Sequence, residues 1–160
     1  MSELEDKLAA LEAVEAVFSQ NRVPYALVGG LAVGIRSGVP RATLDSDFAI
    51  PTSVDRDWLT DRFTTAGFQV KGRYTHSTHL LHGSGEPVHL IFDAGFDAMI
   101  ERAELLPLGD FEVRVVTHED LLAMKRRAAS DPERCRSKSL RDQADVILLE
   151  GDTRESVECW

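Results

Sequence analysis

The segment that decides the fold reads Val28-Gly-Gly-Leu-Ala-Val-Gly-Ile-Arg-Ser-Gly-Val-Pro-Arg-Ala-Thr-Leu-Asp-Ser-Asp-Phe-Ala-Ile50. A short apolar run, residues 25–28, leads into it and predicts a buried strand. Gly29 and Gly30 end that strand, and residues 31–36 then have the pattern of a helix, which later glycine and proline residues terminate. The segment therefore begins as a strand, a glycine turn and a helix.

Residues 44–50 alternate between two sets of side chains, which predicts a second strand. Asp45 and Asp47 are two residues apart, so they project from the same face of that strand. Two carboxylates this close repel each other unless a cation lies between them. Hard oxygen ligands of this kind suit Mg²⁺ or Mn²⁺, usually shared with substrate phosphates. Upstream, Gly29 and Gly30 let a ligand approach the backbone, and the start of the next helix offers N–H groups to an anion.

The rest of the chain mixes helical and extended patterns without strict alternation. This predicts an α+β fold with one mixed sheet, helices mainly on one face and two C-terminal helices. We expect one domain over residues 1–150, followed by a tail at 151–160. The expected helices are 3–20, 31–36, 54–66, 96–103, 117–129 and 138–149, and the expected strands are 25–28, 44–50, 68–74, 78–82, 87–92 and 112–116.

Composition narrows the class of protein. The chain has 160 residues, 43% of them hydrophobic, and a net charge of −9, which disfavours sequence-independent binding to nucleic acid. Its two cysteines form no Cys-x-x-Cys pair, which favours a reducing compartment. We find no signal peptide and no apolar run long enough to span a membrane, so we expect a cytoplasmic protein without a membrane partner.

The charge is distributed unevenly along the sequence. Residues 125–141 hold seven basic side chains and two acidic ones. Such an island on an acidic protein either faces a phosphate or is the solvated end of a helix. Within it, Lys125 is either a phosphate ligand or an exposed helical lysine.

These motifs together resemble a known family, the nucleotidyltransferase superfamily related to DNA polymerase β, in its minimal, abortive-infection (AbiEii-like) branch. The resemblance spans roughly residues 20–150. The residues that carry it are Gly29-Gly30, Arg41-x-Thr43-x-Asp45-x-Asp47, Glu119-Asp120-Leu121-Leu122-Ala123-Met124-Lys125 and Arg141-Asp142-x-x-Asp145.

The resemblance implies that a nucleoside monophosphate is transferred from an NTP to an acceptor, with Mg²⁺ or Mn²⁺ as cofactor. Asp45 and Asp47 would hold the metal ions, Gly29 and Gly30 would bind the triphosphate, and Lys125 is a further candidate for phosphate binding. The resemblance does not specify whether the acceptor is tRNA, a protein or a small molecule. The branch also implies a toxin–antitoxin or phage-defence role, with an antitoxin-type protein as partner.

The sequence departs from the family at the third acid. The family places an Asp on a neighbouring strand, and the matching stretch, residues 87–93, has His89 at that position and Asp93 four residues later. About 13 Å of extended strand separates the two, so we expect only one of them near Asp45 and Asp47, and the alignment favours His89.

Two other functions remain open. If neither His89 nor Asp93 replaces the acid, the chain is a catalytically degenerate protein that binds a nucleotide or a partner. A less favoured reading is a zinc-dependent hydrolase built on His76, His79, His82 and His89, although their spacing matches no standard zinc motif. Arg41 and Thr43 are expected to brace the loop before the two aspartates.

Overall fold

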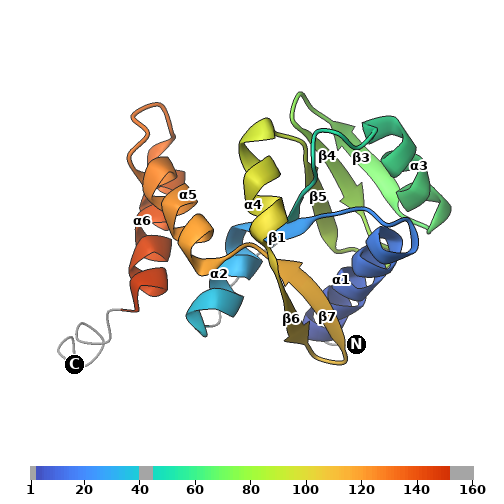
Figure 1. The fold of residues 1–160 in the computed structure, drawn as a ribbon, viewed down its shortest axis with the longest axis horizontal. Coiled ribbons are helices and arrows are strands. Elements are labelled where there is room, and N and C mark those ends of the chain that lie inside the picture. The colour runs from blue at the N-terminus through green and yellow to red at the C-terminus, as the bar shows by residue number, and fades with distance from the viewer. Residues whose placement is uncertain (1–2, 40–44, 152–160) are drawn as a thin grey trace.

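A seven-stranded mixed sheet with six α-helices forms the molecule in the computed structural model, which describes residues 3–39 and 45–151 (Figure 1). The strand order is β3-β4-β5-β2-β1-β7-β6. The strands are β1 (Ala26–Val28), β2 (Ser46–Ala49), β3 (Gln69–Arg73), β4 (Ser77–Leu81), β5 (Pro87–Ile91), β6 (Glu104–Leu108) and β7 (Phe111–Val115). The helices are α1 (Glu3–Gln20), α2 (Gly29–Ser37), α3 (Arg56–Thr65), α4 (Asp97–Arg102), α5 (His118–Ala129) and α6 (Arg136–Glu150), with a 3₁₀ turn η1 (Ala94–Phe96). The expected α+β class is confirmed.

Strand β2 lies near the middle of the sheet, and its two neighbours, β1 and β5, run in opposite directions to each other. It runs antiparallel to β1, which places Val28 opposite Asp47, and parallel to β5, which places His89 opposite Asp47. The hairpin of β4 and β5 then sets His79 opposite His89. This register brings the end of β1 and the polar residues of three further strands to one region of the sheet.

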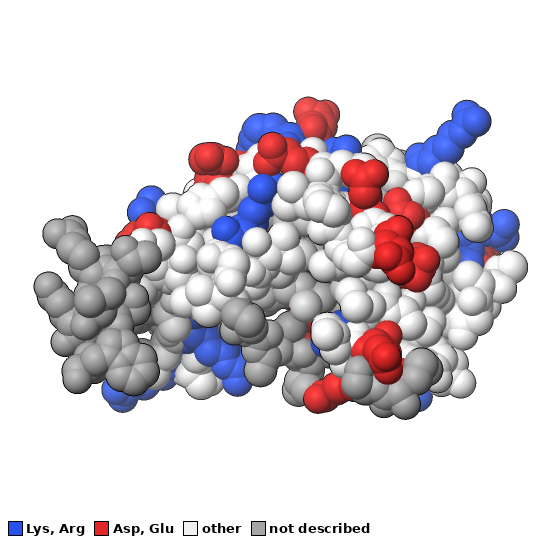
Figure 2. Space-filling model, turned by 90° about the horizontal axis from the view of Figure 1, so that it is seen from below, with Lys and Arg blue, Asp and Glu red and all other residues white. Residues whose placement is uncertain are grey.

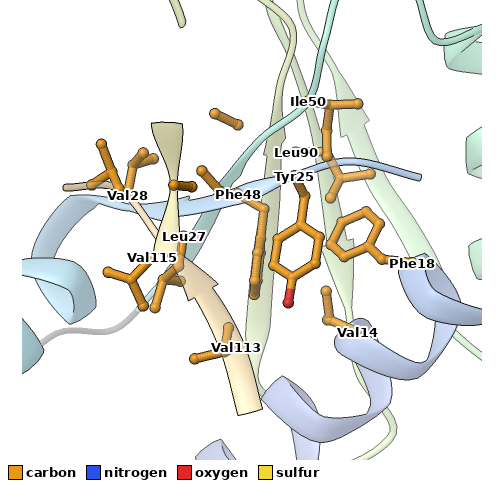
Figure 3. Close-up of a cluster of buried hydrophobic side chains, with 14 of the residues drawn as sticks. Val14, Phe18, Tyr25, Leu27, Val28, Phe48, Ile50, Leu90, Val113 and Val115 are labelled. Carbon is orange, nitrogen blue, oxygen red and sulfur yellow. The ribbon is translucent and has the colours of Figure 1, made fainter. Parts of the chain in front are cut away.

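The part of the core drawn in Figure 3 lies between this sheet and helix α1, and buried residues of the other helices, including Leu59 and Phe63 of α3, belong to the same cluster. The ring of Phe18 stacks on Tyr25 at 4.4 Å and lies 5.7 Å from Phe48 and 5.5 Å from Phe63. Phe48 therefore faces the core. Because side chains alternate along a strand, its neighbour Asp47 projects from the opposite face of the sheet. The alternation predicted for this strand is confirmed.

Local sequence signals explain where several helices begin and end. The hydroxyl of Thr117 accepts a hydrogen bond from the backbone N–H of Asp120 at 3.1 Å, as the sequence predicted, and Asp55 caps α3 in the same way through Trp58 N at 2.9 Å. Gly151 ends α6 in the left-handed conformation, at φ 65°. No helix in the described ranges is long and apolar enough to cross a membrane.

One strand was not predicted. Residues 104–108 form β6, which pairs antiparallel with β7 through a tight turn in which Gly109 has φ 63°. Pro107 lies within this run, and proline weakens a strand assignment because it cannot donate a hydrogen bond to the ladder. Here β6 is the edge of the sheet, where a proline is tolerated. Strand β3 forms the other edge.

The C-terminal helices α5 and α6 pack against each other and lie to one side of the sheet, next to α2 (Figure 1). Helix α2 starts at the glycine turn after β1. The C-terminal helical hairpin is therefore connected to the predicted site through this short helix.

Candidate active site

The two aspartates lie where β2 begins and face away from the core. Asp45 directly precedes the strand and Asp47 is its second residue, with side chains 44% and 25% exposed. Ser46, between them, points the other way and is fully buried, and its hydroxyl has no hydrogen-bond partner among the described residues. The strand therefore presents two accessible carboxylates on one face.

Gly29 lies directly against Asp47 and begins helix α2. Its φ is +72°, and a Cβ at this position would approach Asp47 Oδ2 far inside van der Waals contact and Asp47 Cγ at 3.1 Å. Val28 gives α2 no side-chain cap, and the first turn holds no acidic residue. The backbone N–H groups at the start of α2 thus lie next to the aspartates without a competing carboxylate in the same turn.

His89 approaches both carboxylates from β5. Its Nδ1 lies 3.2 Å from Asp47 Oδ1, and its Nε2 lies 3.8 Å from Asp45 Oδ1. The hydrogen bond with Asp47 raises the pKa of His89 above its ordinary value, although burial acts in the opposite direction, and the charge of Asp45 raises it further. The imidazole therefore occupies the place where the resemblance expected a third acid.

The ring of His79 stacks on that of His89. The two centroids are 3.7 Å apart with planes only 12° from parallel, and Ser77 Oγ lies 3.3 Å from His79 Nε2. Burial lowers the pKa of His79, and the neighbouring His89 lowers it further. His79 also contacts Tyr74, with ring centroids 4.6 Å apart.

Asp93 lies elsewhere. It follows the end of β5, is exposed, and its carboxylate accepts a hydrogen bond from Gly95 N at 2.9 Å at the start of η1. The structure thus brings His89, and not Asp93, to the two aspartates. The prediction that only one of the two residues lies there agrees with this placement, and the proposed catalytic use of Asp93 has no geometric support.

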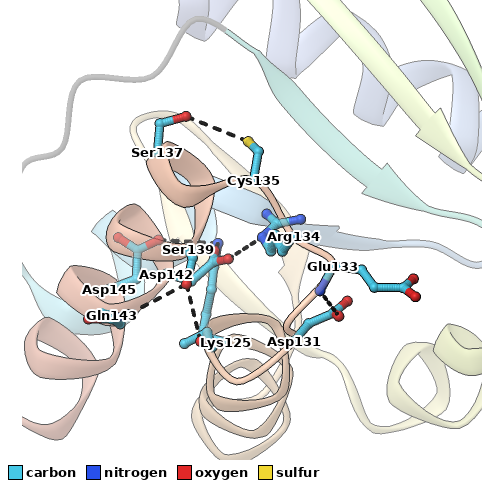
Figure 4. A network of polar contacts seen from close by, with 11 residues as sticks. Lys125, Asp131, Glu133, Arg134, Cys135, Ser137, Ser139, Asp142, Gln143 and Asp145 are labelled. Atoms are coloured by element: carbon cyan, nitrogen blue, oxygen red, sulfur yellow. Dashed lines mark hydrogen bonds and ion pairs between the residues drawn. The ribbon is translucent and has the colours of Figure 1, made fainter.

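Lys125 is not an exposed helical lysine, and that interpretation is wrong. Only 15% of its side chain is exposed, and its ammonium group lies 3.2 Å from Asp142 Oδ1 and 3.1 Å from Asp145 Oδ2 (Figure 4). Both aspartates are 1% exposed, and Arg134 forms a further ion pair with Asp142. The network joins α5 to α6. A phosphate-binding role for Lys125 stays a prediction, since two buried carboxylates already neutralise it.

Three of the seven basic residues in the basic island are held in ion pairs. Lys125 and Arg134 turn toward the buried aspartates, and Arg126 pairs with Glu150 at 2.8 Å. The other basic residues of this stretch are exposed. On the face of the molecule drawn in Figure 2, acidic and basic side chains are interspersed.

The histidine-rich hairpin does not assemble a zinc site. His82 contacts Ser84 Oγ at 2.8 Å and the ring of Phe68 at 5.2 Å, and His76 is exposed. Within residues 3–39 and 45–151, no group of three or more His, Cys, Asp or Glu side chains is arranged to hold a metal ion. Arg41 and Thr43 lie outside the described residues.

Two carboxylates nevertheless suit one kind of metal. Mg²⁺ commonly keeps several waters and is held by one or two protein carboxylates together with substrate phosphates. Asp45 and Asp47 are oxygen donors on one strand face, accessible and next to a helix start that suits phosphate. Imidazole is a softer ligand than Mg²⁺ prefers. The donor set therefore fits a divalent ion whose coordination is completed by a nucleotide.

Sequence reasoning missed the partner of His89. The sequence interpretation treats His79 only as one of several histidines in the hairpin, although the spacing of the hairpin indicates its pairing with His89. The hairpin turns at Gly83–Gly85, so residues at the same sequence separation before and after Ser84 pair with each other. Positions 79 and 89 are each five residues from Ser84 and are therefore opposite one another. Strand pairing within a predicted hairpin was enough to find the contact.

The arrangement of the mixed sheet and its helices is the DNA polymerase β-like nucleotidyltransferase fold, which several solved structures share. ANT(2″)-Ia in complex with adenylyl-2″-tobramycin matches with a TM-score of 0.63 at 18% identity, over 94% of this chain and 93% of that one. The lincosamide antibiotic adenylyltransferase LnuA, lincomycin-bound, matches with a TM-score of 0.63 at 13% identity, over 94% and 97%. A putative nucleotidyltransferase from Thermotoga maritima matches with a TM-score of 0.66 at 14% identity, over 91% and 96%.

The family to which the chain belongs is shown by a family model that matches most of the sequence. Residues 10–157 match the family model described as "Nucleotidyl transferase AbiEii toxin, Type IV TA system". This chain belongs to the AbiEii nucleotidyltransferase family. No curated protein sequence matches it significantly.

Proposed function

We propose that the chain transfers a nucleoside monophosphate from an NTP to an acceptor hydroxyl, with release of pyrophosphate. The observation that carries this proposal is the cluster formed by Asp45, Asp47 and His89 beside Gly29 at the start of α2. Family membership supports it. Two structural relatives support it as well, one solved in complex with adenylyl-2″-tobramycin and the other a lincosamide antibiotic adenylyltransferase.

The nucleotide is oriented by the backbone and the carboxylates. The N–H groups at the start of α2 are available to bind the triphosphate, and Gly29 lets Asp47 lie directly beside them because it carries no side chain. A divalent ion held by Asp45 and Asp47 would neutralise the charge that develops on the transferred group and align the attacking and leaving oxygens.

His89 is placed to receive a proton. Its Nδ1–H donates to Asp47 Oδ1, which fixes the tautomer and leaves Nε2 as an acceptor in the neutral ring. The acceptor oxygen forms its bond to the α-phosphorus while the bond from that phosphorus to the bridging oxygen of pyrophosphate breaks. The proton of the acceptor hydroxyl passes to His89 Nε2.

One observation favours a second function. When protonated, His89 forms ion pairs with both aspartates and thus supplies the positive charge that a metal would bring. In that form the site binds a nucleotide or a protein partner without catalysis, as in the partner-binding member of a toxin–antitoxin pair. The family model includes a toxin of such a system. Both functions are consistent with a cytoplasmic protein.

The decisive experiment incubates the protein with each labelled NTP, Mg²⁺ or Mn²⁺ and cell extract, and looks for a labelled product. Calorimetric titration of Mn²⁺ accompanies it. The double variant Asp45→Asn, Asp47→Asn should lose both metal binding and product. The matched control is Asp110→Asn, Glu112→Gln, which removes two exposed charges away from the site. Metal affinity that is equal in both double variants would eliminate the proposed metal site.

His89→Asp separates the two functions. If His89 replaces the acid of an active enzyme, the substitution supplies the carboxylate expected at this position, tightens Mg²⁺ binding and raises transfer. If wild type forms no product and His89→Asp does, the natural chain is the non-catalytic binding protein.

A further inference from the structure

One row of paired residues crosses four neighbouring strands on the face of the sheet that carries the two aspartates. Gly72 of β3 pairs with His79 of β4, and His79 in turn pairs with His89 of β5. His89 then pairs with Asp47 of β2, which lies against Gly29. Because residues that pair directly project to the same face of a sheet, the side chains of this row are neighbours and can support one another.

The hydrogen bond to Asp47 does not by itself fix the imidazole of His89. His89 Nδ1 lies 3.2 Å from Asp47 Oδ1, but a ring held at one atom can still turn, since the outer torsion of a histidine side chain is broad. The ring of His79 supplies a second constraint, with centroids 3.7 Å apart and planes 12° from parallel. It covers one face of the imidazole and so holds Nδ1 at Asp47 and Nε2 on the side of Asp45, 3.8 Å from Oδ1.

His79 is itself held from two sides. Ser77 Oγ lies 3.3 Å from His79 Nε2, and the ring of Tyr74 lies 4.6 Å from that of His79. Tyr74 covers Gly72, where a Cβ would meet its Cε2 and its hydroxyl oxygen at 2.8 Å. An aromatic ring over a glycine stabilises an edge strand such as β3. Tyr74 therefore takes the place of the side chain that the row lacks at Gly72 and supports His79.

Arg56, at the start of α3, anchors the turn that carries these supports. Its guanidinium donates to Tyr74 O at 2.6 Å and to Thr75 O at 3.2 Å, and also to Ser77 O. The backbone N–H of Tyr74 donates to Ser77 O at 2.8 Å. Packing and hydrogen bonds thus fix the residues behind His79, which is what a side chain needs in order to orient its neighbour accurately.

We propose that His79 is a positioning residue of the candidate active site, and that it holds the imidazole of His89 in its hydrogen-bonded orientation against Asp47. The inference rests on the proposed function, in which His89 Nε2 receives the proton of the acceptor hydroxyl. A proton acceptor must lie within hydrogen-bond reach of the proton that it takes, so a ring free to turn is a poorer acceptor. His79 acts through His89 and takes no proton itself.

The first measurement is the transfer assay on two variants of His79. His79→Ala should lower kcat about tenfold and leave KM for the NTP within about twofold of wild type, because the loss falls on the proton transfer and not on nucleotide binding. His79→Phe should recover most of the rate, because a flat ring again covers His89. His76→Ala is the matched control, since His76 is an exposed histidine directly before β4. Wild-type kcat in His79→Ala would overturn the proposal.

A double-mutant cycle shows whether His79 acts through His89. In a His89→Ala background, the change His79→Ala should have no further effect on the residual kcat, because the ring that it positions is gone. A further tenfold loss in that background would mean that His79 acts on the reaction by another route, and it would overturn the proposal.

The ring nitrogens of His89 give a second readout, which needs no transfer. In alkaline buffer, in which the imidazole is neutral, NMR of the ¹⁵N-labelled protein should show one His89 tautomer in wild type. Its proton lies on Nδ1, which donates to Asp47. His79→Ala should show exchange between both tautomers, and His79→Phe should keep the single one. A single unchanged tautomer in a folded His79→Ala variant would overturn the proposal.

The two proposals can fail separately. If no NTP yields a labelled product but His89 loses its single tautomer in His79→Ala, the transferase function fails and the positioning of His89 by His79 stands. If product forms and His79→Ala changes neither kcat nor the tautomer of His89, the transferase function stands and the role of His79 is wrong.

Discussion

Replacing Gly29 by alanine tests the link between the glycine turn and the metal site. At φ +72° an L-residue with a Cβ costs about 1–2 kcal/mol. The new methyl group also meets Asp47, whose carboxylate must turn away and give up its 3.2 Å contact with His89. Loss of one such contact costs a further ~0.5–1.5 kcal/mol. We therefore expect Gly29→Ala to destabilise the protein by about 2–3 kcal/mol, which corresponds to a drop in Tm of roughly 5–10 °C.

A double-mutant cycle with Asp47→Ala isolates the contact. Urea unfolding gives the free energy of each single variant, the double variant and wild type. Without the carboxylate only the backbone strain remains, so Gly29→Ala in the Asp47→Ala background should cost only about 1–2 kcal/mol. The same loss in both backgrounds would refute the steric argument. A displaced carboxylate should also lower transfer by about a hundredfold, since small misplacements at a reacting centre have effects of this size.

Three further predictions concern stability. Burial raises the pKa of Tyr25 to about 12, so its stabilising contribution is complete below pH ~10 and is lost as the pH rises toward 12, at about 1.4 kcal/mol per pH unit. Urea midpoints of wild type should fall over that range relative to those of Tyr25→Phe, and parallel pH profiles would contradict this. Ser46→Ala removes a buried hydroxyl that has no hydrogen-bond partner among the described residues, and it should stabilise the fold by ~1 kcal/mol, seen as a Tm higher by roughly 2–4 °C. A lower Tm would show that the hydroxyl is satisfied in solution. Lys125→Met leaves Asp142 and Asp145 without their shared cation and should destabilise by about 3–5 kcal/mol in chemical denaturation, and adding Asp145→Leu should recover part of this loss. A loss below ~1 kcal/mol would mean that Lys125 is largely solvated.

Local patterns in the sequence were sufficient to place the two aspartates and the glycine turn within the fold. The period-two alternation of residues 44–50 put Asp45 and Asp47 on one face, and the glycine pair marked the start of α2. The hairpin around Ser84 and the cap at Thr117 depend on residues close in sequence. Such features are predictable because the atoms that determine them are only a few residues apart.

Contacts between distant elements were not predictable in the same way. Lys125 is largely buried because α6 packs along α5 and brings Asp142, 17 residues away in the sequence, into contact with it. The sequence of α5 alone does not indicate this contact. The β6 strand was missed because Pro107 argues against a strand unless the run is known to be an edge. That knowledge comes only from the complete strand order.

The two edges of the sheet have a consequence for behaviour at high concentration. An open edge presents unpaired N–H and C=O groups and is a template on which other chains aggregate. Edge strand β3 carries exposed Lys71 and Arg73 and an irregularity in its pairing between Val70 and Gly72, and edge strand β6 contains Pro107. Charges, bulges and proline all oppose the addition of another strand. Growth of the sheet from one molecule to the next is thus disfavoured at both ends, and concentrated solutions should resist fibril formation.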